Sequence, residues 1–205
     1  MLVAERTLVK QLGRVAYRPA VEAMRAFTAA RDAETADELW LLEHPPVYTL
    51  GQGADPVHGP RVDNGIPVVR TGRGGEITYH GPGQLVLYAL VDLARRGITV
   101  KRFVWILEQA VIDLLDGHGA RIAGAPGVYV GGAKIAALGI RVSRGCAWHG
   151  LALNVDMDLA PFAAIDPCGK PGLGVTQLRA LGMTEPVEVV GARLAQCLLH
   201  ELDDA

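Results

Sequence analysis

Three consecutive β-prone segments constrain the fold more than any other feature of this sequence. They read GVYVGG, AKIAALGIRVSRG and CAWHGLALNVDMDL, and they follow one another from residue 127 to residue 159. Glycine-rich turns join them, and short turns of this kind connect strands that lie antiparallel to each other. The sequence therefore predicts a meander of antiparallel strands in this region.

Helical patterns lie on both sides of these strands. Apolar side chains recur at helical spacing in residues 100–115 and after Pro186, and a shorter helix is predicted after Pro19. Further β-prone segments cover residues 39–42, 47–50, 66–69 and 84–93. Because the helices flank the strands and do not alternate strictly with them, the pattern predicts an α+β fold with a mixed, largely antiparallel sheet flanked by helices. The length fits one domain that spans residues 1–205.

The composition restricts the classes of function. Half of the residues are hydrophobic and a fifth are charged, as in soluble globular proteins, and no apolar run reaches the roughly 18 residues that cross a bilayer. The net charge of -2 provides no overall positive field for nucleic acid. Residues 1–18 become polar too early for a secretory signal, and an odd number of irregularly spaced cysteines fits a reducing compartment. We therefore expect a cytoplasmic protein with no nucleic-acid partner and no membrane association.

A glycine-rich segment at residues 70–88 is the first candidate binding site. Arg73 precedes two glycines, and a second turn, Gly-Pro-Gly, follows His80. Glycines let a ligand approach backbone N–H groups closely. The segment lacks the Lys-Ser or Lys-Thr of a Walker A loop and the three-glycine spacing of a dinucleotide site. Spacing alone leaves two interpretations open, a ligand-binding loop or two tight turns with an incidental histidine.

Lys134 and Cys168 stand out by their surroundings. Lys134 lies in an otherwise apolar strand, so its ammonium must either extend to water or meet a partner that tolerates its charge. Cys168 lies in a loop between proline and glycine, whereas Cys197 has the helical spacing of an inert core cysteine. Cys146 and His149 form a Cys-x-x-His pair, but no second close pair of ligands completes a zinc site, so we expect no metal. Four histidines are expected to be solvated: His44, His58, His118 and His200.

Four longer motifs carry a resemblance to a known family. They read RGGEITYHGPGQ, GGAKIAALGIRV, GCAWHGLALNVDMDL and PFAAIDPCG, and their order and spacing resemble those of the lipoyl(octanoyl) transferase family over residues 40–180. The resemblance implies a fold similar to lipoate ligases, biotin protein ligases and class II aminoacyl-tRNA synthetases. It also implies transfer of an octanoyl group from octanoyl-acyl carrier protein, through a cysteine thioester, to a lysine of a lipoyl domain. The implied acceptors are the lipoyl domains of 2-oxoacid dehydrogenase complexes and the glycine cleavage H protein, and no cofactor is implied.

The same resemblance implies roles for individual residues. By motif position, the acyl-carrying cysteine corresponds to Cys168, and the lysine that activates it corresponds to Lys134. An adjacent ammonium favours the reactive thiolate form of a cysteine. Either Lys134 or His149 is expected to accept the proton of the incoming lysine. The implied substrate contacts are Arg73, Gly74, Gly75, Glu76, Ile77, Thr78, Tyr79, His80, Ala137, Leu138, Gly139, Gly150, Leu151 and Ala152.

The chain departs from the family pattern at two positions, and two other functions stay open. Asp166 stands where Asn is common and Glu76 where Gln is frequent, and neither change removes a reacting group. An ATP-dependent lipoate or biotin protein ligase of the same fold would need a site for an adenylate and would not need Cys168. A noncatalytic module that binds an acyl chain or a lipoyl domain would need neither Cys168 nor Lys134.

Overall fold

The chain folds around two β-sheets. The computed structural model describes residues 7–205, and the strands in this range are β1 (Leu8–Arg14), β2 (Glu38–Glu43), β3 (Val47–Leu50), β4 (Val68–Arg70), β5 (Ile77–His80), β6 (Gln84–Asp92), β7 (Ala120–Ile122), β8 (Ala125–Val130), β9 (Ala133–Ser143) and β10 (Cys146–Asn154). The larger sheet has the order β1-β2-β6-β10-β9-β8-β7, and the smaller sheet has the order β4-β3-β5. β1 pairs with β2 and β3 pairs with β4 in parallel, and the other neighbours are antiparallel.

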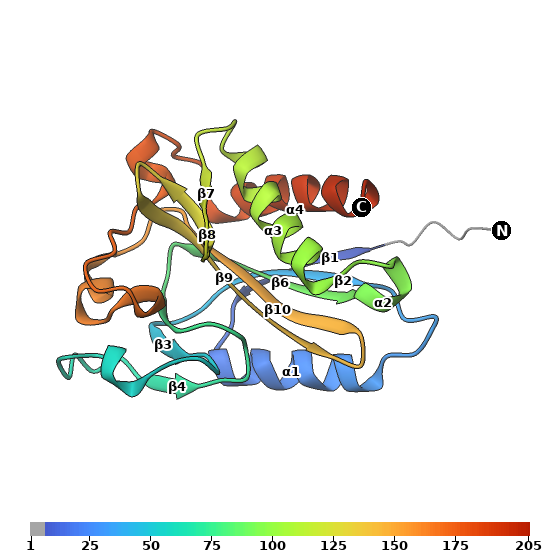
Figure 1. Cartoon of the computed structure of the whole chain (residues 1–205), viewed down its shortest axis with the longest axis horizontal. Helices are drawn as coiled ribbons and strands as arrows, with labels where there is room; N and C mark the ends of the chain where they lie inside the picture. The colour runs from blue at the N-terminus through green and yellow to red at the C-terminus, as the bar shows by residue number, and fades with distance from the viewer. Residues whose placement is uncertain (1–6) are drawn as a thin grey trace.

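Helices cover both faces of the larger sheet. They are α1 (Tyr17–Ala30), α2 (Leu93–Arg96), α3 (Val100–Leu114) and α4 (Val187–Asp203). α3 and α4 lie on one face and α1 lies on the other (Figure 1). Along β6, Leu85 and Leu87 pack towards α3 and α4, whereas Val86 and Tyr88 pack towards α1. Successive side chains of a strand point to opposite faces, so this apolar strand is buried on both sides. The predicted α+β fold is therefore confirmed.

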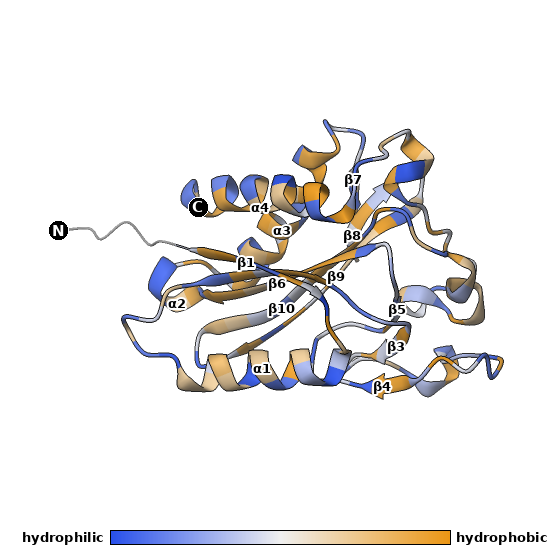
Figure 2. Ribbon diagram, turned by 180° about the vertical axis from the view of Figure 1, so that it is seen from behind, coloured by the Kyte–Doolittle hydropathy of each residue, from blue (hydrophilic) through white to orange (hydrophobic). Residues whose placement is uncertain are grey.

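The apolar residues that define these layers are concentrated in the central strands (Figure 2). The predicted meander is confirmed as β8, β9 and β10, and the predicted helices are confirmed as α1, α3 and α4. The sequence pattern does not predict β1, β5 or β7. Every residue of β1 is exposed, so this strand has no apolar alternation, and it forms through its parallel pairing with β2.

β9 extends beyond its neighbour β8, and this overhang leaves room for a site. β8 pairs with β9 only between Ala133 and Ala136, whereas β10 pairs with β9 as far as Ser143. A loop from the smaller sheet, residues 71–76, crosses the overhang, and the N–H of Gly74 donates to the Ile140 carbonyl at 2.8 Å. Gly139 permits this crossing, because a Cβ atom at that position would lie 2.9 Å from the Gly74 carbonyl oxygen.

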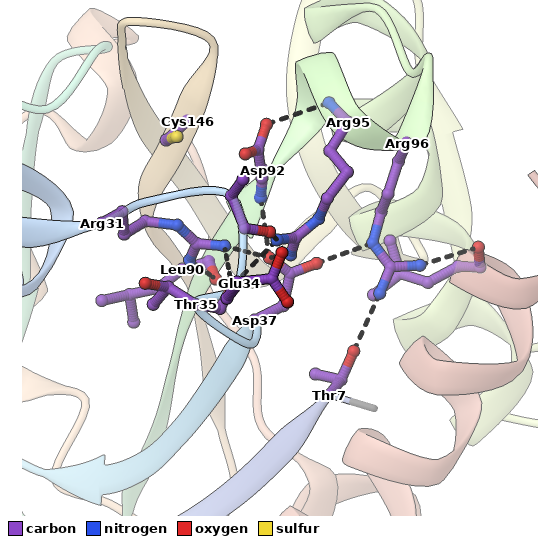
Figure 3. Close-up of polar contacts among 12 residues, drawn as sticks. Thr7, Arg31, Glu34, Thr35, Asp37, Leu90, Asp92, Arg95, Arg96 and Cys146 are labelled. Atoms are coloured by element: carbon purple, nitrogen blue, oxygen red, sulfur yellow. Dashed lines mark hydrogen bonds and ion pairs between the residues drawn. The ribbon is translucent and has the colours of Figure 1, made fainter. Parts of the chain in front are cut away.

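The buried carboxylate of Asp37 joins the ends of several helices and strands of the larger sheet. Asp37, which is 1% exposed, accepts hydrogen bonds from Arg31 at 2.5 Å, from Arg95 at 3.0 Å and from Arg96 at 2.7 Å (Figure 3). The N–H of Asp92 donates to the same carboxylate at 2.9 Å. Burial raises the pKa of Asp37, but the hydrogen bonds from Arg96, Asp92 and Arg31 outweigh it and hold the pKa below its usual value. This carboxylate links α1, β2, β6 and α2.

No helix within residues 7–205 has both the length and the apolar composition needed to span a membrane. Residues 1–6 belong to the segment that the sequence predicts not to be a secretory signal, and they lie outside the described range.

Candidate active site

A cavity of about 340 Å³ lies where the 71–76 loop, β9, β10 and the short 3₁₀ turn η3 (Pro167–Gly169) meet. Its volume is within the usual range for small-molecule sites. Nearly all of the expected substrate contacts line it: Arg73, Gly74, Gly75, Glu76, Ile77, Thr78, His80, Ala137, Leu138, Gly139, Gly150, Leu151 and Ala152. Cys168, Lys134 and His149 line it as well. The fold therefore brings residues from four separate motifs to one cavity.

Lys134 and Cys168 are in direct contact. Lys134 is 4% exposed, so the interpretation that its ammonium extends to water is wrong. Its Nζ donates hydrogen bonds to Cys168 Sγ at 2.8 Å and to the Pro126 carbonyl at 2.9 Å. The Nζ also lies 4.9 Å from the centre of the Tyr129 ring. A partly accessible cysteine beside a cation is the arrangement of an activated nucleophile.

The backbone of Lys134 holds the chain that follows Cys168. The N–H of Lys134 donates to the Gly174 carbonyl at 2.8 Å, and the N–H of Thr176 donates to the Lys134 carbonyl at 2.9 Å. These two bonds form a short parallel bridge between β9 and the loop. Lys134 therefore positions the loop through its main chain and contacts the thiol through its side chain.

Cys168 occupies a strained turn. Its φ of 58° and ψ of 26° lie in the left-handed region, which residues other than glycine rarely adopt. The N–H of Gly169 closes the turn by donating to the Asp166 carbonyl at 2.9 Å. The Arg61 guanidinium pairs with the Asp166 carboxylate, and the Asp166 N–H donates to the His58 carbonyl. Strain that surrounding contacts maintain is frequent at functional sites.

The two departures from the family pattern both lie beside this turn. Asp166 anchors it as described above, and the Glu76 carboxylate lies 3.4 Å from His58 Nδ1. A Cβ atom at Gly169 would lie 3.2 Å from the Glu76 carboxyl carbon, so Glu76 packs directly against the turn. Both side chains therefore support the backbone that presents Cys168.

A buried arginine provides a second positive charge at the cavity. Arg73 is 8% exposed, and its guanidinium donates to the Thr49 carbonyl at 2.7 Å, to the Thr49 hydroxyl at 2.8 Å and to the Gly74 carbonyl at 3.0 Å. Burial lowers the pKa of Arg73. Because an arginine stays protonated even so, a cation held by neutral oxygen atoms faces the cavity.

Two buried histidines beside the cavity have both ring nitrogens engaged. His80 contacts Gln84 Oε1 at 2.7 Å and the Thr49 hydroxyl at 3.3 Å. His44 contacts the Val15 carbonyl at 2.6 Å and the Tyr88 hydroxyl at 2.7 Å. The expectation that His44 is solvated is wrong, because the side chain is fully buried and contacts Tyr88 of β6 and His80 of β5. His118 and His200 are exposed as expected, and His58 is partly buried.

Burial keeps His80 and His149, which line the cavity, and their neighbour His44 in the neutral form near pH 7. Burial lowers the pKa of His44 to about 4 and that of His149 to about 3. Burial also holds the pKa of His80 well below 6.5, and the nearby charge of Arg73 lowers it further. Neutral imidazoles can donate and accept hydrogen bonds at the same time.

Tyr79 is the one expected contact that does not line the cavity. Its ring packs against Tyr48 and Phe162 in a separate apolar cluster. Other residues line the cavity without having been expected from the sequence: Tyr17, Val86, Tyr88, Val104, Gly124, Ala125, Pro126, Ile140 and Lys170. A hydroxyl inside the apolar run of β6 was a usable signal for Tyr88, whereas the others are brought there by packing between distant segments.

The sequence is similar to those of proteins whose family is known. The family model described as the lipoyl protein ligase A/B catalytic domain matches residues 16–199. An octanoyltransferase from Azoarcus sp. (strain BH72) is 61% identical over 198 residues, which cover 95% of this chain and 87% of the relative. An octanoyltransferase from Thiobacillus denitrificans (strain ATCC 25259 / T1) is 62% identical over 194 residues, which cover 93% of this chain and 88% of the relative.

Solved structures share the fold at low sequence identity. The bi-partite lipoate protein ligase from Thermoplasma acidophilum is 16% identical and superimposes with a TM-score of 0.77, covering 96% of this chain and 84% of that one. The biotin protein ligase from Aquifex aeolicus, in complex with biotin and ATP, is 11% identical with a TM-score of 0.60, covering 96% and 71%. The expected similarity of fold to lipoate ligases and biotin protein ligases is confirmed. The chain therefore belongs to the lipoyl protein ligase A/B catalytic domain family, and the octanoyltransferases among its relatives mark it as an acyltransferase.

Proposed function

We propose that this chain transfers an octanoyl group from octanoyl-acyl carrier protein to a lysine of a lipoyl domain, with Cys168 as the intermediate acyl carrier. The observation that supports this most strongly is the 2.8 Å contact between Lys134 Nζ and Cys168 Sγ at the cavity. A ligase that activates a free acid as an adenylate needs no thiol at this position. The pair therefore favours the transferase over an ATP-dependent ligase, and over a noncatalytic binding module.

In the first step the Cys168 thiolate attacks the carbonyl carbon of the donor thioester. The bond between that carbon and the carrier sulfur breaks, and Lys134 gives a proton to the departing sulfur. The products are S-octanoyl Cys168, a neutral Lys134 amine and the free carrier thiol. An ammonium has three N–H donors, and two of those on Lys134 are engaged, so the third is available to stabilise the oxyanion during the attack.

In the second step the neutral amine of the acceptor lysine attacks the octanoyl carbonyl carbon. The carbon–sulfur bond breaks, the amide forms, and the neutral Lys134 amine accepts the proton that the attacking nitrogen loses. Cys168 returns to a thiolate and Lys134 to an ammonium. A thioester is converted into an amide, which is downhill, so the reaction needs no nucleotide.

The position of His149 argues against it as the proton acceptor. In the β9–β10 register His149 lies opposite Ile140, which is six residues along β9 from Lys134. At about 3.3 Å of rise per residue, the Cα atoms of Lys134 and Ile140 are about 20 Å apart. We therefore assign the proton transfers to Lys134.

The acceptors are the lipoyl domains of 2-oxoacid dehydrogenase complexes and the glycine cleavage H protein. Three unpaired cysteines are consistent with a reducing, cytoplasmic setting. Because both sheets contribute residues to the cavity, we treat the chain as one catalytic domain.

The test is to incubate the protein with octanoyl-acyl carrier protein in the absence of ATP and to measure intact mass. We expect one octanoyl group on Cys168, which transfers to a lipoyl domain when that is added. Cys168→Ala should abolish both steps. The matched variant Cys197→Ser should still be acylated on Cys168, because Cys197 lies on α4 outside the cavity. Acylation that requires ATP and free octanoate would identify a ligase, and transfer by the Cys168 variant would exclude the thioester mechanism.

A further inference from the structure

His149 breaks the regular geometry of β10. Its φ is 63°, in the left-handed region, although it lies in the middle of the strand. The pairing between β6 and β10 is interrupted at this point. Ala147 pairs with Val91 and Gly150 pairs with Tyr88, but Trp148 and His149 have no partner on β6. Successive strand residues normally face opposite sides. Here the His149 ring stacks on Trp148 at 4.6 Å and meets the Tyr88 ring at 5.8 Å, so consecutive rings share one face of the sheet.

This strained backbone buries an imidazole that finds no hydrogen-bond partner among the described residues. His149 is 1% exposed, and neither of its ring nitrogens is hydrogen-bonded within residues 7–205. His44 and His80, its neighbours, have both nitrogens bonded to protein groups. Buried polar atoms that lack a partner destabilise a fold and call for an explanation. His149 lines the cavity, so its partner is expected to come from the contents of the cavity.

The ring lies at the end of the cavity away from the thiol. Between Lys134 and His149 the cavity is lined by small residues of the neighbouring strands β9 and β10: Ala137, Gly139, Gly150 and Ala152. An acyl chain attached to Cys168 and extended along these walls would direct its distal end towards His149. The imidazole is neutral, because burial lowers its pKa to about 3. It therefore presents one donor nitrogen and one acceptor nitrogen.

We propose that His149 determines which distal ends of the acyl chain are accepted, and that it favours medium-chain acyl groups with a terminal hydroxyl over alkyl chains of the same length. The inference rests on the proposed function, because it places the acyl carbonyl at Cys168. In this proposal an octanoyl chain stops short of the imidazole and leaves a water molecule on it. A ninth atom would displace that water, which a methyl group cannot replace and a hydroxyl can.

The experiment compares two donors of equal length, nonanoyl and 8-hydroxyoctanoyl, on the same acyl carrier protein. The two compete at equal concentration, and intact mass gives the ratio of adducts on Cys168. For the unmodified protein we expect the hydroxylated chain to be favoured about three- to tenfold. His149→Leu should reverse the preference. His149→Asn should retain part of it, because Asn keeps donor and acceptor atoms and tolerates left-handed backbone.

His44→Leu is the matched control. It makes the same chemical change in a buried histidine that does not line the cavity, so it should lower stability without changing the ratio. A preference for nonanoyl in the unmodified protein, or an unchanged ratio in His149→Leu, would overturn the proposal. If His149→Leu does not fold, the unmodified protein and His149→Asn still decide the question.

If the proposed function is wrong, none of the donors will acylate Cys168, and this result differs from a changed ratio of adducts. Calorimetric titration with nonanoate and with 8-hydroxyoctanoate then tests His149 without any transfer. Tighter binding of the hydroxylated acid by the unmodified protein, lost in His149→Leu, supports the proposal, and equal binding of the two acids refutes it.

Discussion

At the scale of single residues, the proposed mechanism assigns the activation of the Cys168 thiol to Lys134. Lys134→Ala removes the ammonium that lies 2.8 Å from Cys168 Sγ. Without this cation beside the sulfur, alkylation of Cys168 by iodoacetamide should slow by roughly tenfold at pH 7.

Lys170→Ala is the control for this measurement. Lys170 also lines the cavity and lies two residues from Cys168, but its side chain is exposed and does not bond to the sulfur. Its removal should change alkylation far less. Equal rates for the Lys134 variant and the unmodified protein would show that the contact does not activate the thiol.

At this scale the sequence predicts much of the site. The motifs place Cys168 and Lys134 in one site, and the two side chains are in contact. The glycine-rich segment lines the cavity, so it is not merely a pair of tight turns. The sequence does not predict Tyr17, because a tyrosine at the start of an amphipathic helix has the pattern of a core residue. It also misplaces His44, whose burial depends on how the two sheets meet.

Among the elements, the β9–β10 hairpin is the least tolerant of added volume. A Cβ atom at Gly150 would collide with the Leu87 backbone carbonyl on β6, which cannot move without breaking the sheet. Gly150→Ala should therefore lower the free energy of unfolding by about 1 to 3 kcal/mol, measured by urea denaturation. Gly174→Ala is the control, because its Cβ would make an ordinary contact of 3.6 Å. Equal stability of the two variants would mean that β6 and β10 can separate locally.

The junction between α1, β2 and α2 depends on Asp37. Asp37→Asn leaves the surrounding guanidinium groups without their carboxylate, and we expect it to lower the free energy of unfolding by about 3 to 5 kcal/mol. Asp204→Asn, at an exposed contact with His200, should change stability by less than about 1 kcal/mol. A small effect at Asp37 would show that water reaches this cluster.

Elements with a strong apolar pattern are the ones that the sequence predicts. α3, α4 and β6 have long apolar patterns, and their positions follow from them. β5 has four residues within the glycine-rich segment, and it is defined by pairing with β3. Local patterns contain no information on such pairing partners.

For the whole molecule, the buried neutral histidines predict a loss of stability in mild acid. The folded-state pKa is about 4 for His44, about 3 for His149 and well below 6.5 for His80. In the unfolded chain these groups bind protons near pH 6.5. The stability is therefore fully present above about pH 6.5 and falls as the pH drops towards 4, by up to about 1.4 kcal/mol per pH unit for each histidine.

Urea denaturation at several pH values between 8 and 5 measures this slope. His44→Gln should reduce it, and His118→Gln, at an exposed position, should not. The contribution of Asp37 falls in a separate window, because its lowered pKa places its loss below about pH 4. A flat profile between pH 7 and pH 5 would contradict the neutral state of the three histidines.

Lys134 contacts the thiol through its side chain and holds the Cys168 loop through its main chain, so a substitution can remove the first contact and keep the second. In Lys134→Ala the backbone bonds to Gly174 and Thr176 remain, so the Cys168 loop keeps its anchor while a space the size of an alkylammonium ion opens beside the sulfur. A small primary amine supplied in the buffer can fill that space, and its charge then replaces the one that was removed. Chemical rescue should therefore be selective for amine size, with methylammonium and ethylammonium restoring the first step and bulkier amines excluded.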